Sequence, residues 1–336
     1  MMLCDKVVLV TGGTGSFGKK FAEIVLSKYK PRKLIIFSRD ELKQLEMREE
    51  FGEDRYGCIR YFIGDVRDRE RLYRAFDGVD IVVHAAALKQ VPTAEYNPIE
   101  TVKTNVLGAA NVIDAAIDRN VKKVIALSTD KAANPVNLYG ATKLCSDKLF
   151  IGANNYAGQH GTRFSVVRYG NVIGSRGSVI PFYLRQLRTG VLPVTDPRMT
   201  RFWITLEQGA EFVLRCLDLM WGGEIFVPKI PSMNILDLAR AIGPECRIEI
   251  TGIRPGEKLH EVMVAEDDAR NTAEYGDYYV ILPAFHDWEA QEYLARNGGK
   301  QCPSGFSYCS NANDRWLSAE QLRTMVGLTS APGTSA

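Results

Sequence analysis

The sequence lacks the patterns of metal-binding and disulfide-rich proteins. It has only seven cysteines and four histidines in 336 residues, with no Cys-x-x-Cys pair and no histidines at metal-ligand spacing. A zinc site needs closer ligands, and a disulfide framework is normally denser in a shorter chain. We therefore expect reduced thiols and no metal, and His84, which lies in an apolar segment, is expected to be a core residue.

It also lacks a long apolar run and an excess of charge of either sign. No segment is apolar over the length that crosses a bilayer, and the strand pattern begins close to Met1, which leaves no room for a signal peptide. Lysine and arginine total 42 against 40 acidic residues. We therefore expect a cytoplasmic protein without a membrane span, whose main partner is neither nucleic acid nor an anionic membrane.

The first half of the sequence alternates short apolar segments with helical ones. Strands are expected at residues 7–11, 33–38, 59–64, 79–85, 123–128 and 163–169, with helices between them, for example at 69–76 and 99–119. Strands that are apolar on both faces and separated by helices indicate an α/β fold with a doubly wound parallel sheet of the Rossmann type. We expect residues 1–170 to form this dinucleotide-binding domain and to carry the catalytic residues.

After Tyr169, glycines and prolines break the chain into shorter elements. We expect residues 171–328 to form a smaller lobe over the carboxyl ends of the sheet, where open α/β sheets bind ligands, with some segments returning to the Rossmann core. The last residues, 329–336, are predicted to be a disordered tail.

A glycine-rich turn follows the first predicted strand directly and opens a helix. Its pattern is Gly12-x-x-Gly15-x-x-Gly18. The first glycine permits the tight turn, the second lets the backbone approach a pyrophosphate, and the third lets the helix pack on the sheet. Glycines are common in turns of every kind, but the strand and helix around this one predict a dinucleotide site that includes Gly12, Thr14, Gly15, Ser16, Phe17 and Gly18.

The end of the second predicted strand favours NADP over NAD. NAD enzymes usually have an acid there that holds the ribose 2′-hydroxyl, whereas this chain has Ser38 and Arg39, with Lys43 one helical turn further on. A hydroxyl and two cations suit a 2′-phosphate. The alternative is a solvated helix start in which Asp40 is only an N-cap. Further cofactor contacts are expected beside the adenine and after the fourth strand, from Asp65, Val66, Ala85, Ala86, Ala87 and Lys89.

Thr129, Tyr139 and Lys143 are the expected centre for oxidation of an alcohol. Tyr139 and Lys143 are four residues apart after the fifth strand, on one face of a predicted helix, and both are expected to contact the cofactor. A phenol has a pKa of about 10, too high for a base at neutral pH, and a neighbouring ammonium lowers that pKa. Together with Thr129, the pair can remove a hydroxyl proton while hydride leaves the same carbon.

These residues resemble the extended short-chain dehydrogenase/reductase superfamily and, within it, the nucleotide-sugar 4,6-dehydratases. Most of those enzymes have an Asp-Glu pair before the tyrosine, whereas this chain has Asp130-Lys131. The Thr-Asp-Lys-Ala-x-Asn-Pro run at 129–135 resembles the UDP-N-acetylglucosamine 4,6-dehydratases. Their retaining members usually have methionine in place of Tyr139, so the chain resembles the inverting enzymes that open pseudaminic acid synthesis. The stretches 88–92, 95–98 and 254–258 match as well.

The resemblance implies a role for each catalytic residue. Tyr139 takes the proton of the sugar 4-hydroxyl as NADP accepts the C4 hydride, and the resulting ketone acidifies the C5 proton. Lys131 then acts as the base at C5, for which it must be neutral, and burial beside Lys143 and the nicotinamide is expected to achieve this. Asp130, protonated, gives its proton to the departing 6-hydroxyl. Without the resemblance, Asp130 and Lys131 would be an ordinary loop ion pair.

Five residues are expected to hold UDP-N-acetylglucosamine. Lys89 follows the fourth strand, and Asn171 matches the family's asparagine near the diphosphate. Arg254 and Glu257 lie in a Pro-Gly turn, where arginine can pair with a phosphate and glutamate with a ribose. Arg201 is a weaker candidate, and a solvated surface position is the alternative for both arginines.

Other functions stay open at this point. A retaining 4,6-dehydratase would share the chemistry, whereas a nucleotide-sugar 4-epimerase would need neither Asp130 nor Lys131. A non-catalytic NADP-binding regulator would tolerate the loss of Tyr139, and it is the least favoured alternative because the catalytic residues are all present. The resemblance also implies a homo-oligomer.

Overall fold

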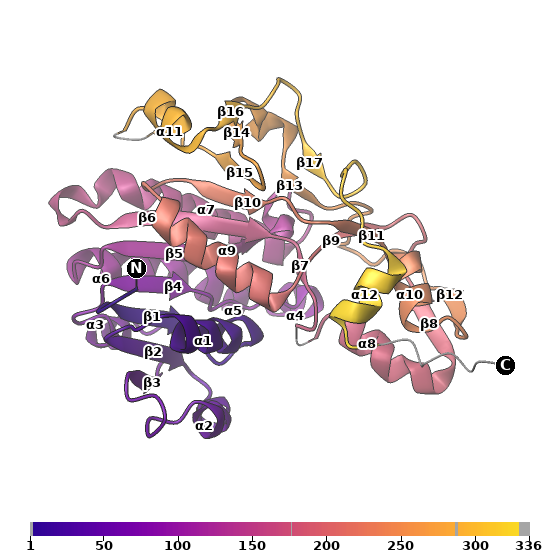
Figure 1. The fold of residues 1–336 in the computed structure, drawn as a ribbon, viewed down its shortest axis with the longest axis horizontal. Helices are drawn as coiled ribbons and strands as arrows, with labels where there is room; N and C mark the ends of the chain where they lie inside the picture. The colour runs from indigo at the N-terminus through magenta and orange to yellow at the C-terminus, as the bar shows by residue number, and fades with distance from the viewer. Residues whose placement is uncertain (1–2, 176, 286–287, 329–336) are drawn as a thin grey trace.

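The computed structural model describes residues 3–175, 177–285 and 288–328, and a ten-stranded sheet forms its centre (Figure 1). Parallel strands make up most of this sheet: β1 (Val7–Thr11), β2 (Lys33–Ser38), β3 (Ile59–Ile63), β4 (Ile81–His84), β5 (Lys123–Thr129), β6 (Arg163–Tyr169) and β10 (Ile225–Pro228). Antiparallel strands extend it beyond β10: β14 (Thr272–Glu274), β15 (Tyr278–Ile281) and β16 (Lys300–Gln301). The strand order is β16-β14-β15-β10-β6-β5-β4-β1-β2-β3.

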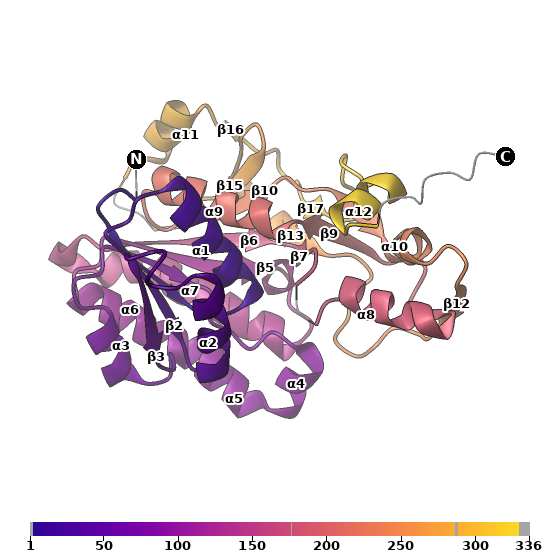
Figure 2. The same ribbon diagram turned by 60° about the horizontal axis from the view of Figure 1, so that its bottom comes forward.

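Helices cover both faces of this sheet (Figures 1 and 2). On one face α1 (Ser16–Lys28) packs against α9 (Leu206–Leu219), and on the other α6 (Gly108–Asp118) packs against α3 (Arg69–Ala75) and α7 (Leu138–Tyr156). Strand β1 is buried along its whole length, because side chains on both of its faces contact a helix layer. Strand β1 lies between β2 and β4, so the chain reverses direction across the sheet at the carboxyl end of β1. Open α/β sheets bind ligands at such a reversal.

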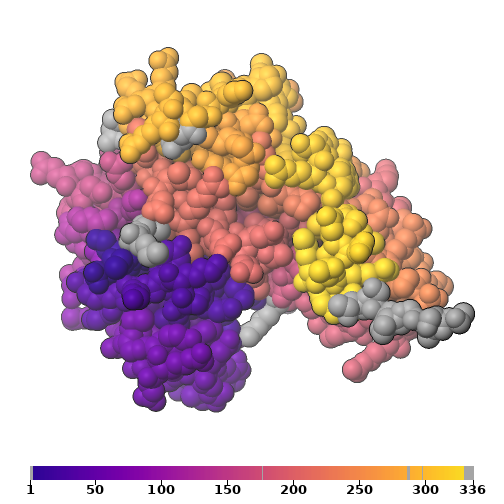
Figure 3. All heavy atoms as spheres, viewed as in Figure 1, coloured from indigo at the N-terminus to yellow at the C-terminus, as the bar shows by residue number. Residues whose placement is uncertain are grey.

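A second group of short elements packs beyond the carboxyl ends of the sheet. It contains α8 (Val179–Gln186), α10 (Ile235–Ile242) and α12 (Ala319–Met325). Three small sheets accompany them, formed by β7 (Asn171–Val172) with β9 (Thr200–Ile204) and β11 (Ser232–Asn234), by β8 (Val191–Val194) with β12 (Arg247–Ile250), and by β13 (Val262–Val264) with β17 (Tyr308–Cys309). The helices share a core of their own around Trp203 and Leu238. The space-filling view shows a notch between this lobe and the indigo-to-purple N-terminal part of the chain (Figure 3).

The chain passes between the lobe and the main sheet more than once. Helix α9 and strands β10, β14, β15 and β16 belong to the main sheet layer although they follow residue 170. The sequence analysis allowed for such returns, and the division of the chain at residue 170 stays a prediction. The predicted tail, residues 329–336, lies outside the described residues. In the part of the chain that the structure describes, no helix has the length and apolar character needed to cross a membrane.

The strands of the first half end within two residues of their predicted limits, and the fold class is confirmed. One predicted helix, at residues 99–119, is broken into three pieces: α5 (Pro98–Val102), a π-helical turn (Lys103–Leu107) and α6. Asn105 in the π turn explains the irregularity, because its side chain bonds both the N–H and the C=O of Leu88. A π turn re-aims one side chain without ending the helix. Helix α2 (Glu41–Glu50) lies between β2 and β3, as the alternation of strands and helices predicted, whereas α4 (Val91–Tyr96), α8, α11 (Ala290–Asn297) and α12 were not predicted.

Candidate active site

One cavity of about 970 Å³ spans the carboxyl ends of the main sheet and the inner side of the lobe. Apart from Asp130, every residue predicted to bind cofactor or substrate or to catalyse the reaction lines it. On the cofactor side these are Gly12, Thr14, Gly15, Ser16, Phe17, Gly18, Ser38, Arg39, Lys43, Asp65, Val66, Ala85, Ala86, Ala87 and Lys89. On the catalytic and substrate side they are Thr129, Lys131, Tyr139, Lys143, Asn171, Arg201, Arg254 and Glu257.

The turn between β1 and α1 requires glycine at two positions. Gly12 has a φ of +65°, and a Cβ there would lie 2.9 Å from the Ala86 backbone. A Cβ on Gly18 would lie 2.3 Å from the Gly13 carbonyl oxygen. Gly15 stands at the N-cap of α1 and supplies no side-chain cap, so amides of the first helical turn remain available to an anion. The turn is therefore a cradle with room for a pyrophosphate and for no side chain.

The floor beside this turn is held by Thr11. Its hydroxyl accepts hydrogen bonds from the N–H groups of Ala85 and Ala86, at 3.2 and 3.3 Å, and contacts His84 Nδ1 at 2.8 Å. His84 is fully buried, and burial lowers its pKa to about 3, with Lys143 lowering it further in the same direction. His84 is therefore a neutral core residue, as the sequence indicated.

At the end of β2, the predicted 2′-phosphate site has its cations, and each of them has an acidic partner. Lys43 Nζ pairs with Asp40, and Arg39 lies 3.6 Å from Asp65. Asp40 also accepts a hydrogen bond from the Lys43 N–H at 3.0 Å and so caps α2. The side chains of Arg39 and Lys43 are roughly half exposed, so a phosphate could draw either cation away at small cost.

The catalytic segment is a tight connection between β5 and α7. Asn137 caps α7 by accepting the Gly140 N–H at 2.8 Å, which fixes Tyr139 in the first helical turn. A Cβ on Gly140 would lie 2.2 Å from the Lys131 carbonyl oxygen, so the helix and the loop before it touch. Tyr139 and Lys131 thereby enter the same cavity from neighbouring backbone segments.

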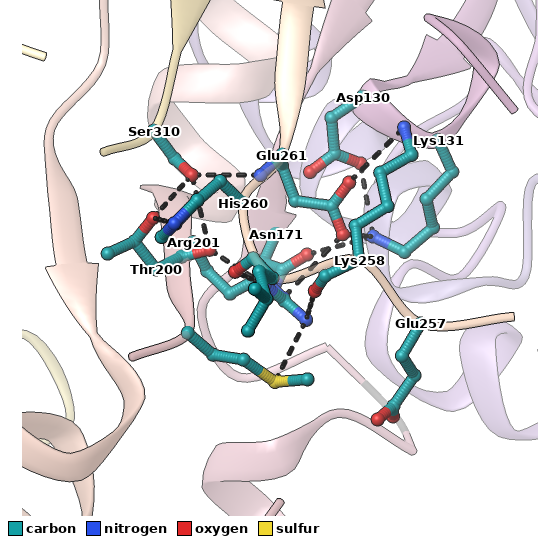
Figure 4. A network of polar contacts seen from close by, with 12 residues as sticks. Asp130, Lys131, Asn171, Thr200, Arg201, Glu257, Lys258, His260, Glu261 and Ser310 are labelled. Carbon is teal, nitrogen blue, oxygen red and sulfur yellow. Dashed lines mark hydrogen bonds and ion pairs between the residues drawn. The ribbon is translucent and has the colours of Figure 1, made fainter. Parts of the chain in front are cut away.

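Lys131 makes three polar contacts in the structure. Its Nζ lies 3.1 Å from Asp130 Oδ1, 3.3 Å from Asn171 Oδ1 and 3.5 Å from Glu261 Oε1 (Figure 4). An ammonium has three N–H donors, and three acceptors match it. Burial lowers the pKa of Lys131, but the carboxylates of Asp130 and Glu261 outweigh burial and raise it. The expected neutral amine is therefore wrong for this structure, because the nearest charges are carboxylates rather than Lys143.

Asp130 differs from the other predicted catalytic residues because it is fully buried and does not line the cavity. Its Oδ1 accepts a hydrogen bond from the Thr129 hydroxyl at 2.8 Å as well as the one from Lys131. Burial raises the pKa of Asp130, against the opposing charge of Lys131. The direction of this pKa shift agrees with the sequence-based expectation that Asp130 holds a proton during the reaction. Its connection to the cavity passes through Thr129 and Lys131.

The charged forms of Tyr139 and Lys143 are less stable in this structure than the sequence analysis expected. Burial raises the pKa of Tyr139 to about 12, while Lys131 and a hydrogen bond with Thr129 act to lower it. Burial also lowers the pKa of Lys143, opposed by the carboxylate of Asp147. The sequence analysis assigned the activating ammonium to Lys143, and in the structure that charge comes from Lys131. The reason is proximity across the β5–α7 connection, which helical spacing does not reveal.

The predicted substrate residues fall into two groups. Lys89, Asn171, Arg254 and Glu257 form the first group and line the cavity, and Glu257 accepts the Arg254 N–H at 3.3 Å. Arg201 is buried instead, and its guanidinium donates to the carbonyl oxygens of Thr200, Lys258 and Leu259 at 2.8 to 3.0 Å. Most of the donors of Arg201 are therefore used to hold the 258–261 segment.

Two charged residues that line the cavity were not among the predicted site residues. Glu261 is a buried carboxylate that lines the cavity, and Lys258, beside it, donates to the Ala133 carbonyl oxygen at 2.6 Å. Only their position just after the Pro-Gly turn could have drawn attention to them. Among the described residues no group of three or more side chains is arranged to hold a metal ion.

Comparison with known proteins identifies the family of this chain. Residues 8–283 match the family described as polysaccharide biosynthesis protein. The chain belongs to this family. The chain is similar to a "UDP-N-acetylglucosamine 4,6-dehydratase (inverting)" of Campylobacter jejuni, with 55% identity over 98% of this chain and 99% of the relative. A "UDP-glucose 4-epimerase" of Rickettsia canadensis is 41% identical over 97% of this chain and 96% of its own length.

Solved structures resemble this family member over most of its length. The X-ray structure of Pen from Bacillus thuringiensis superposes with a TM-score of 0.88 at 38% identity, covering 97% of this chain and 98% of that one. DesIV, a dTDP-glucose 4,6-dehydratase from Streptomyces venezuelae with NAD and TYD bound, gives a TM-score of 0.67 at 21% identity, over 86% of this chain and 95% of that one. The sequence-based resemblance to extended short-chain dehydrogenase/reductases is confirmed.

Proposed function

We propose that the chain is an NADP-dependent UDP-N-acetylglucosamine 4,6-dehydratase that inverts C5. The observation that carries this proposal is the joint presence of Thr129, Lys131 and Tyr139 at the wall of one cavity that also contains the glycine cradle. The inverting dehydratase of Campylobacter jejuni, at 55% identity, supports the substrate and the stereochemical outcome. A role in pseudaminic acid synthesis, which the sequence resemblance implies, is consistent with this activity and is part of the proposal.

The residues fit NADP on structural grounds. The Gly12–Gly18 turn leaves space where side chains would stand, and Arg39 and Lys43 supply positive charge where a 2′-phosphate would lie. Bound NADP supplies a hydride acceptor at C4 and a hydride donor at C6. Ser38, at the strand end, adds a hydroxyl that suits a phosphate oxygen.

The protein's own residues move the protons. Tyr139 accepts the proton of the 4-hydroxyl, which requires its phenolate, and Lys131 stabilises that charge. With a ketone at C4, the C5 proton becomes acidic, and Lys131 removes it once its amine is neutral. Asp130 supplies the proton with which the 6-hydroxyl departs as water. Since Asp130 does not line the cavity, that proton travels through its hydrogen bonds to Thr129 or Lys131. Return of a proton to the opposite face of C5 inverts the sugar.

The substrate is held by residues from both halves of the chain. Arg254 and Glu257 suit the diphosphate and the ribose, and Lys89 and Asn171 suit the sugar end of the cavity. Arg201 contributes by fixing the segment that follows Glu257. Burial lowers the pKa of Lys89, assisted by the charge of Lys131, so this lysine gains from an anionic ligand.

A homo-oligomer in the cytoplasm completes the proposal. Large apolar side chains are exposed on α4, α5 and the π turn, namely Tyr96, Ile99 and Leu107. Exposed apolar side chains gathered on neighbouring helices favour contact with another protein surface. Light scattering of the purified protein measures the oligomeric state directly.

A mass measurement tests the function. Purified protein is incubated with UDP-N-acetylglucosamine and NADP, and the sugar nucleotide is weighed by mass spectrometry. Loss of one water supports a dehydratase, whereas an epimerase leaves the mass unchanged, and UDP-glucose is the comparison substrate because of the epimerase relatives. Proton NMR in deuterated water then reports whether C5 exchanges and inverts. Retention at C5 would replace the inverting enzyme by the retaining one.

A further inference from the structure

Glu261 is a buried carboxylate in the wall of the cavity whose position is fixed by the backbone. Its side chain is only 3% exposed. Its N–H donates to the Ser310 hydroxyl at 2.9 Å, and its carbonyl accepts the Ser310 N–H at 2.8 Å. These bonds belong to the junction of β13 with the segment after β17, which is remote in sequence from the catalytic loop. The backbone position of Glu261 is therefore set by its pairing with Ser310 and not by contacts inside the cavity.

Three cations surround the Glu261 carboxylate. Its Oε1 lies 3.5 Å from Lys131 Nζ and 3.6 Å from Arg201 Nε, and its Oε2 lies 3.8 Å from Lys258 Nζ (Figure 4). Oε2 is buried and has no hydrogen-bond partner. A buried charge is costly unless it is paired and hydrogen-bonded, so a buried carboxylate that has ion pairs but no hydrogen bond on Oε2 calls for a functional reason.

Glu261 and Asp130, the two carboxylates beside Lys131, differ in their affinity for a proton. Burial would raise the pKa of Glu261, but Lys131, Arg201 and Lys258 together lower it. Burial raises the pKa of Asp130, and the negative charge of Glu261 adds to that rise. A proton that leaves Lys131 therefore goes to Asp130.

We propose that Glu261 is a positioning residue: held ionised between Arg201 and Lys258, it keeps the Lys131 amine beside Asp130, so that Lys131 passes its proton to Asp130 before acting at C5. This inference rests on the proposed function. The transfer breaks one N–H bond of Lys131 and forms one O–H bond on Asp130, across the 3.1 Å hydrogen bond between them. It leaves a neutral amine and a carboxylic acid, the two forms that proton removal at C5 and departure of the 6-hydroxyl require.

The charge of Glu261 also sets the pH range of the reaction. The groups that face Lys131 are Asp130, Glu261, Arg201, Lys258, Lys89 and Tyr139. The active form of the Lys131–Asp130 pair carries one proton between the two groups, which gives a bell-shaped pH profile. Glu261 raises the pKa of both members, so removing its charge lowers both and moves both limbs of the profile to lower pH.

Three variants test the proposal with UDP-N-acetylglucosamine and NADP. For Glu261→Gln we expect both limbs of the kcat profile to move down by about one pH unit, and deuterium incorporation at C5 to fall at least about tenfold because the amine is no longer held. Glu261→Asp keeps the negative charge but places it further from Lys131, because the side chain is shorter. We expect the limbs of the kcat profile to stay in place in this variant while deuterium incorporation at C5 falls.

Glu224→Gln is the matched control. Glu224 is also fully buried and accepts hydrogen bonds from Ser165 and Gly222, but it does not line the cavity. We expect this variant to lose stability without any movement of the pH limbs.

The outcomes distinguish failure of the role proposed for Glu261 from failure of the proposed function. Unmoved limbs in Glu261→Gln, or an equal movement in Glu224→Gln, overturn the role of Glu261. If Glu261→Gln does not fold, Glu261→Asp decides, and C5 incorporation equal to that of the wild type overturns the proposal. Failure of the wild-type protein to release water from the substrate refutes the proposed function instead.

Discussion

Replacement of Arg39 by methionine tests the preference for NADP. Arg39 lines the cavity at the end of β2, is 55% exposed, and lies 3.6 Å from Asp65. Methionine keeps the length of the aliphatic side chain and removes the charge. If Arg39 binds a 2′-phosphate, the variant loses affinity for NADP, while NAD, which has no phosphate there, is bound as before.

The expected size of this effect follows from two opposing contributions. A hydrogen bond to a charged group contributes about 1.5–3 kcal/mol. To bind the phosphate, Arg39 must leave Asp65, an exposed pair that contributes roughly 0.2–1 kcal/mol. The net preference is about 0.5–2.8 kcal/mol, which corresponds to roughly a 2- to 110-fold weaker affinity for NADP in the variant.

Isothermal titration calorimetry with each dinucleotide measures the two affinities in wild type and variant. NAD serves as the internal control, because any general damage to the cofactor site weakens both ligands. An equal loss for NAD and NADP would refute the assignment of Arg39. So would a wild-type protein that binds NAD as tightly as NADP.

Three further substitutions probe the proton chemistry and the core. Tyr139→Phe should lower kcat by about 10²- to 10⁴-fold with little change in stability, and a smaller loss would mean that another base serves C4. Asp147→Asn leaves Arg168 buried without its partner at 3.3 Å and should cost about 3–5 kcal/mol in urea unfolding, whereas a cost below about 1 kcal/mol would show that the pair is dispensable. Because burial lowers the pKa of His84 from 6.5 to about 3, this residue binds a proton in the unfolded chain but not in the folded one between these pH values. The free energy of unfolding therefore decreases as the pH is lowered from 6.5 to 3. His84→Gln should flatten this fall by up to about 1.4 kcal/mol per pH unit, and an unchanged slope would contradict the buried neutral imidazole.

Local patterns predicted the cofactor half of the molecule well. The Gly12-x-x-Gly15-x-x-Gly18 turn, the strand before it and the helix after it are one continuous segment, and the structure has them as expected. Alternation of apolar strands with helices likewise indicated the doubly wound sheet. Such features depend on neighbours a few residues apart, so the sequence reveals them directly.

The break of the helix at 99–119 was not predictable in the same way. The π turn there depends on Asn105 reaching Leu88, a contact between separate segments. A helical pattern in the sequence does not report where a side chain will bond across the fold.

By itself, the sequence determined the fold class, the dinucleotide cradle and the candidate catalytic tyrosine and lysines, because each is a matter of residue type and short spacing. Only the tertiary structure decided that Lys131 is held as an ammonium and that Asp130 is fully buried. Glu261 reaches Lys131 through the pairing of β13 with β17, and burial together with the neighbouring charges then sets the pKa shifts of Lys131, Asp130 and Glu261. Electrostatic energies depend on distance and on exclusion of water, and both are properties of the folded chain.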